Sequence, residues 1–86
     1  MRLRWTQQNT KGVRRYMDSL EMKVAMKRNN DTQEKLAEAL GLQISGVNAR
    51  INGKVDFRSS EIKKIIRRYH LTADDVNRIF FSSAAS

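Results

Sequence analysis

The 86-residue chain contains no cysteine, no proline and only four glycines. The absence of cysteine excludes disulfides, thiol chemistry and cysteine-ligated metal sites, and it is typical of a cytoplasmic protein. The absence of proline favours helices joined by short turns. No apolar run approaches the ~20 residues of a membrane span, and the N-terminus lacks the apolar stretch of a signal peptide. We therefore expect one cytoplasmic domain whose core is held together by packing alone.

Groups that carry catalysis are also scarce. The chain has a single histidine, His70, at the end of a predicted helix, and its acidic residues are scattered. It has no glycine-rich phosphate loop and no spacing of side chains that suits a metal. We expect no enzymatic activity, no cofactor and no metal.

What the sequence has in excess is positive charge. The formal net charge is +8, which favours an acidic partner, and nucleic acid is the partner we expect. Residues 1–16 hold five basic and no acidic residues, whereas residues 17–86 hold twelve basic and nine acidic ones. The first segment has no apolar period, so it is interpreted as a flexible basic arm. Two alternatives stay open: the arm contacts phosphates, or it is not part of the natural domain, which then starts at Met17.

Helical periodicity runs from Met17 to Phe81, and residues 82–86 are expected to be a disordered C-terminal end. Apolar residues recur at helical spacing in five segments, near 17–28, 32–40, 44–52, 59–69 and 73–80. Either Asp31 or Thr32 is expected to cap the second helix, and Thr72 with Asp75 has the spacing of a capping box for the fifth. The predicted fold class is all-α, a five-helix domain over residues 17–81.

Three residues in the middle of the chain define a specific motif. Two short helices joined by a tight turn need a small residue at their contact, which Ala37 provides. Gly41 suits the turn, and Val47 is placed to lock the second helix onto the first. Ala, Gly and Val at these intervals, on segments that are predicted helical, indicate a helix-turn-helix.

Residues 32–54 resemble the helix-turn-helix of the Cro and lambda-repressor group, also called the xenobiotic-response-element family. The residues that match are Thr32-Gln33-Glu34, Leu36-Ala37, Leu40-Gly41, Val47 and Asn52-Gly53-Lys54. The resemblance extends to about residue 81 and includes small phage-encoded Cro-like proteins. It implies a lambda-repressor-like domain that represses transcription by binding double-stranded operator DNA as a homodimer, with its third helix in the major groove.

The resemblance also implies roles for individual residues. The residues expected to face bases are Gln43, Ile44, Ser45, Asn48 and Ala49. Those expected to contact phosphates are Gln33, Arg50, Asn52 and Lys54. Asn48 has the amide that pairs with adenine in two-point fashion. Two positions depart from the family pattern, because Ile44 stands where a polar residue is common and Gly46 where a larger one is common. Ile44 either packs on thymine methyl groups or is partly buried, which would change the reading register.

Other interpretations remain open. The motif could instead be a protein-interaction module, antirepressor-like or antitoxin-like, and the apolar Ile44 favours that alternative. Phe81 is interpreted either as part of a self-association surface or as packing against the first helix. Four basic residues of the fourth helix are expected to form a solvated face, namely Lys63, Lys64, Arg67 and Arg68.

Overall fold

The computed structural model describes residues 15–83 of the chain. It contains five helices, α1 (Ser19–Arg28), α2 (Gln33–Leu40), α3 (Ile44–Ile51), α4 (Ser59–Tyr69) and α5 (Ala73–Phe80). Two short strands, β2 (Arg15–Tyr16) and β3 (Ser82–Ser83), lie at the two ends of this part of the chain. The predicted all-α, five-helix fold is confirmed. No helix of the described part is long and apolar enough to cross a membrane.

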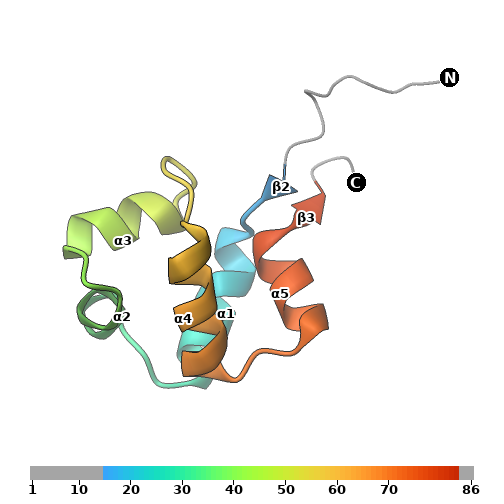
Figure 1. Ribbon diagram of the computed structural model, residues 1–86, viewed down its shortest axis with the longest axis horizontal. Helices are drawn as coiled ribbons and strands as arrows, with labels where there is room; N and C mark the ends of the chain where they lie inside the picture. Colours follow the sequence, from blue (N-terminus) through green and yellow to red (C-terminus); the bar gives the residue numbers. More distant parts are fainter. Residues whose placement is uncertain (1–14, 84–86) are drawn as a thin grey trace, which may run out of the picture.

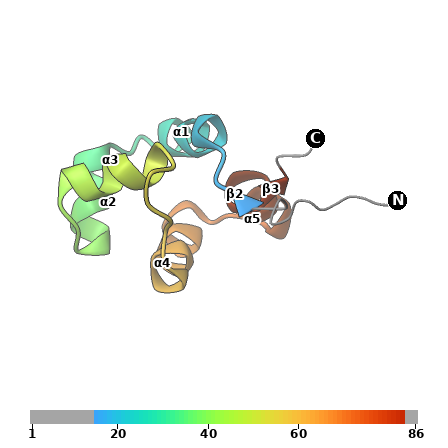
Figure 2. The ribbon, with the colours of Figure 1, turned by 90° about the horizontal axis from the view of Figure 1, so that it is seen from above.

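The helices are arranged around one core. α2 and α3 pack against each other on one side of the molecule, and α1 packs against α5 on the other (Figure 1). α4 overlaps α1 in that view, but seen from above the two helices lie apart, with α1 at the top of the picture and α4 at the bottom (Figure 2). The largest fully buried side chains come from all five helices: Met22, Leu36, Val47, Ile51, Ile65 and Ile79. The core is therefore shared by every helix, and each helix depends on the others for burial of its apolar face.

Short polar side chains set where the helices begin. Asp18 caps α1 by accepting hydrogen bonds from the N–H groups of Leu20 and Glu21. Of the two candidates for the cap of α2, it is Thr32 that accepts from the backbone N–H of Lys35. Thr72 and Asp75 form the predicted capping box of α5.

Asp31, the other candidate for the α2 cap, is used differently. Its carboxylate accepts two hydrogen bonds from Arg68, each 2.8 Å long, and a third from the Tyr69 hydroxyl. These bonds tie the turn between α1 and α2 to the end of α4. The bonds from Arg68 lower the pKa of Asp31, despite opposition from burial. Burial and the bond to the Asp31 carboxylate raise the pKa of Tyr69.

The strand pair differs from the predicted domain boundaries at both ends. β2 pairs antiparallel with β3, with Arg15 opposite Ser83 and Tyr16 opposite Ser82. Residues 15–16 were expected in the arm and 82–83 in the disordered end, and the ordered unit also begins ahead of Met17. A two-residue strand has too few residues to show a period of two, so periodicity did not reveal it. The rest of the predicted arm and end, 1–14 and 84–86, lies outside the described residues.

Candidate nucleic-acid interface

The predicted helix-turn-helix residues form the junction of α2 and α3. Ala37 is 2% exposed and Val47 is fully buried, so the small residue and the locking residue both lie in the core. Gly41 ends α2 with φ of 71°, a left-handed conformation that glycine adopts without steric cost. The N–H of Leu42 donates to the Ala37 carbonyl at 2.9 Å and closes the turn. α3 is thereby held firmly against α2.

α3 presents a continuous outer face. Gln43, Ser45 and Asn48 are exposed, and Ile44 keeps 47% of its surface exposed. Ala49 is half-buried. Ile44 therefore lies on this outer face and outside the core, and its contact with bases stays a prediction. All five residues predicted to read bases remain accessible to some degree, and four of them are exposed.

A row of three amide side chains crosses this face. The Asn52 side-chain amide donates to Asn48 Oδ1 at 3.0 Å, and Asn48 Nδ2 donates to Gln33 Oε1 at 3.3 Å. Gln33 is the first residue of α2, so the row runs from the end of α3 to the start of α2. We call Gln33, Asn48 and Asn52 the amide row. The sequence assigned these residues to DNA contact, but it did not indicate that they bond to one another.

Arg50 is the predicted site residue that the structure places elsewhere. It was expected to face outward toward phosphate. Its guanidinium instead pairs with Glu61 of α4 at 3.0 Å, and its side chain is only 12% exposed. The expectation that Arg50 faces outward is wrong, because the buried carboxylate of Glu61 lies within hydrogen-bond reach and pairs with the guanidinium. Lys54, in the loop that follows α3, is exposed, and its contact with phosphate stays a prediction.

A hollow beside the start of α2 was missed by the sequence reasoning. It has a volume of about 510 Å³, and Lys23 and Lys27 of α1 line it together with Asp31, Thr32 and Gln33. Gln33 belongs both to this hollow and to the amide row, so the two features are continuous. The i, i+4 spacing of the two lysines on the exposed side of α1 was the available signal.

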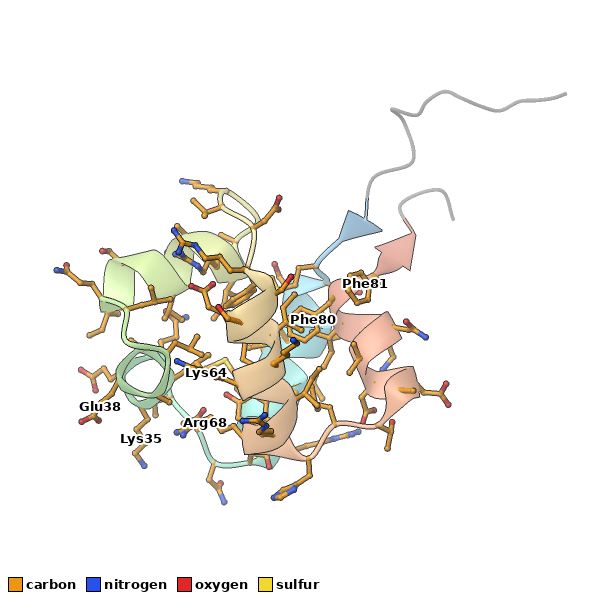
Figure 3. The ribbon with its side chains drawn as sticks, viewed as in Figure 1. Lys35, Glu38, Lys64, Arg68, Phe80 and Phe81 are labelled. Carbon is orange, nitrogen blue, oxygen red and sulfur yellow. The ribbon has the colours of Figure 1, made fainter. Side chains whose placement is uncertain are left out.

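A groove lies beside the C-terminal end of α3. It measures about 360 Å³, and its apolar lining includes Met17, Val55, Phe57 and Phe81. Val55 and Phe81 are 45% and 41% exposed. Phe80 points from α5 toward α4 (Figure 3), and its ring packs edge-on against the ring of Phe57, with the ring centroids 5.9 Å apart. Phe81 lies near the strand pair (Figure 3). Neighbouring aromatic residues thus divide between the core and the surface.

Comparison with known proteins identifies the family. Residues 15–83 match a family described as "Protein of unknown function (DUF739)". The chain belongs to this family. The match begins with β2 and ends with β3, so it covers the same residues that the structure describes. No curated protein matches the chain.

Proposed function

We propose that this DUF739 protein is a sequence-specific DNA-binding regulator, a Cro-like repressor of the phage or prophage kind, which inserts α3 into the major groove of operator DNA. The observation that carries the proposal is the amide row on the exposed face of the α2–α3 pair. An α-helix fits the major groove, and side-chain amides there read adenine through its N6 and N7 atoms.

The amide row orders the side chain that reads the base. Asn48 uses one donor toward Gln33 and one acceptor position toward Asn52. An asparagine amide has two donors and two acceptor lone pairs, so a donor and an acceptor remain for a base edge. Fixing the side chain before binding reduces the entropy lost on complex formation. Asn48 is therefore the residue we expect to discriminate most strongly between base pairs.

Basic groups on both sides of this face supply affinity for the phosphate backbone. Lys23 and Lys27 flank the start of α2, where the helix dipole also favours an anion. Lys54 lies beyond the end of α3. Each cation that meets a phosphate releases a counterion, so binding should weaken steeply as salt is raised. Repression would follow from occupying the operator and excluding the polymerase.

The protein is expected to bind as a homodimer in the cytoplasm. One domain of this size covers little DNA, whereas two related domains on half-sites about one helical turn apart give a specific interface. The groove of Met17, Val55, Phe57 and Phe81 lies at the end of α3 and offers apolar surface for the second copy. Analytical ultracentrifugation of the protein bound to DNA tests the dimer. Two chains per duplex are expected, and one chain per duplex would contradict the dimer.

The test is selection of duplexes from a random library by the 86-residue chain, followed by anisotropy titration of a selected duplex and a scrambled one. We expect roughly a thousandfold or greater preference for the selected duplex. A preference below about tenfold, with affinity that only follows salt, would contradict specific recognition and leave backbone binding alone.

Replacing Asn48 with alanine tests the reading residue. We expect the variant to lose about 1–3 kcal/mol on the selected duplex while binding the scrambled one unchanged. Asn77→Ala, at an exposed position of α5, is the matched control and should leave both affinities unchanged. An equal loss on both duplexes would make Asn48 a backbone contact.

A second candidate function follows from Ile44. This apolar side chain is 47% exposed in the first turn of α3 and suits either thymine methyl groups or a protein partner. An antirepressor-like or antitoxin-like module would use the same face against protein. The duplex selection described above separates the two functions, because a chain that acts only as a protein module would select no duplex.

A further inference from the structure

Arg50 lies in the last turn of α3, and its side chain donates three hydrogen bonds, all within the protein. Its Nε donates to Glu61 Oε1 at 3.0 Å and its Nη2 to Glu61 Oε2 at 3.5 Å. Its Nη1 donates to the carbonyl of Gly46, one turn earlier in α3, at 3.0 Å. The side chains of Arg50 and Glu61 are 12% and 8% exposed. Three of the five guanidinium N–H donors are thus used within the protein.

Glu61 connects this bond to the start of α4. Its Oε1 also accepts a hydrogen bond from the backbone N–H of Arg58 at 2.9 Å, which caps the helix. No backbone hydrogen bond in residues 15–83 joins α3 to α4. Because the segment between these helices has no regular structure, the Arg50–Glu61 pair is the polar link that relates their directions.

Gly46 provides the space that this link needs. A Cβ atom at Gly46 would lie 3.3 Å from Nη1 of Arg50, which is tight for a carbon contact. A glycine within a helix makes the helix less stable than an alanine would, so the presence of Gly46 in the first turn of α3 needs an explanation. Because Gly46 has no side chain, the guanidinium of Arg50 can lie against the backbone of α3. The same observation accounts for the departure from the family pattern at this position.

We propose that Gly46, Arg50 and Glu61 form a brace that sets the angle of α3, so that Arg50 governs sequence discrimination without touching DNA. The two brace residues in α3, Gly46 and Arg50, come two positions before and two positions after Asn48. They therefore hold this helix from the side that faces away from the amide row. The inference rests on the proposed function for its effect on DNA, but the geometry of the brace is testable in the free protein.

Arg50→Lys is the first variant, because lysine keeps the charge and loses the two-pronged bond. We expect affinity for a duplex selected by the parent chain to fall about tenfold, as when one specific contact is lost. Affinity for a scrambled duplex should stay within about twofold, and the slope of log affinity against log salt should not change. Lys54→Met, an exposed cation in the adjacent loop, is the matched control and should reduce that slope by about one.

The double variant Arg50→Met with Glu61→Gln guards against loss of folding. It leaves no unpaired buried charge and keeps an acceptor for the N–H of Arg58, so it should keep its helical circular dichroism while still losing the preference for the selected duplex. If Arg50→Lys binds like the parent while the double variant weakens both duplexes equally and lowers the salt slope by about one, Arg50 is a phosphate contact and the brace is refuted.

Residual dipolar couplings of the free protein test the brace without DNA. Arg50→Lys should change the angle between α3 and α4, and Lys54→Met should leave it unchanged. An unaltered angle in Arg50→Lys would overturn the brace. If the parent chain selects no duplex, the proposed function fails by itself, and the couplings still decide whether Arg50 orients α3.

Discussion

Replacing Asp31 with asparagine removes the carboxylate that ties the α1–α2 turn to α4. The Asp31 side chain is only 3% exposed and accepts from Arg68 and Tyr69 together. Hydrogen bonds to a charged group contribute about 1.5–3 kcal/mol each, and asparagine keeps one acceptor but offers a donor where a second acceptor is needed. Because the Arg68 side chain is one-third exposed, solvent weakens the contribution of its bonds to stability. We therefore expect Asp31→Asn to lower the free energy of unfolding by about 2 kcal/mol.

Urea unfolding near pH 7 measures this loss of free energy. In a thermal unfolding experiment, the melting temperature should fall by about 8–16 °C. Asp56→Asn, at an exposed position, is the control and should change stability by less than about 0.5 kcal/mol. An equally small change in Asp31→Asn would refute the reasoning, because it would mean that the buried carboxylate is replaceable by a neutral amide.

The same variant predicts a dependence on pH. The folded protein lowers the pKa of Asp31 from its ordinary 3.8. A depressed carboxyl pKa gives stability that is complete above the ordinary value and is lost as pH falls through the folded value. The difference in unfolding free energy between the parent and Asp31→Asn should therefore be constant near neutral pH and shrink below about pH 4. A difference that grows on acidification would contradict this.

Three further substitutions test the backbone and the core by urea unfolding. Gly41→Ala should cost about 1–2 kcal/mol from its φ of 71° alone, since no atom lies within 4 Å of the added Cβ, and a neutral result would contradict the left-handed turn. His70→Gly should stabilise by about 1 kcal/mol because His70 ends α4 with φ of 53°, whereas His70→Ala should bring no such gain. Leu36→Ala, at a fully buried position, should cost about 2–5 kcal/mol, and a loss under about 1 kcal/mol would mean that the core is loosely packed.

Local patterns predicted most of the fold because the helices obey them. The apolar spacing within α4, the capping box at Thr72 and the glycine at 41 are determined by neighbours within a few residues, and the structure has each of them. The strand pair could not be predicted, since β2 and β3 are short and meet only when the two ends of the fold come together.

The candidate site was predictable as a surface but not as a set of bonds. The spacing of Ala37, Gly41 and Val47 located the outer face of α3 correctly. Whether a polar residue on α3 points outward or bonds inward depends on partners far away in the sequence. Arg50 was misassigned because Glu61 lies eleven positions later and reaches it only in the folded state. The bonds of Asp31, one of the two candidates for the α2 cap, could not be predicted for the same reason, because Arg68 comes from α4.

The most direct test of the account maps the DNA contact onto individual residues. Amide resonances of the 86-residue chain would be followed by NMR while a selected duplex is added. The account predicts the largest shifts at the start of α2 and along residues 43–49 of α3, with a further group at Asn52 and Lys54. Shifts confined to the basic segment before residue 15, or concentrated on α5, would contradict the claim that α3 reads DNA.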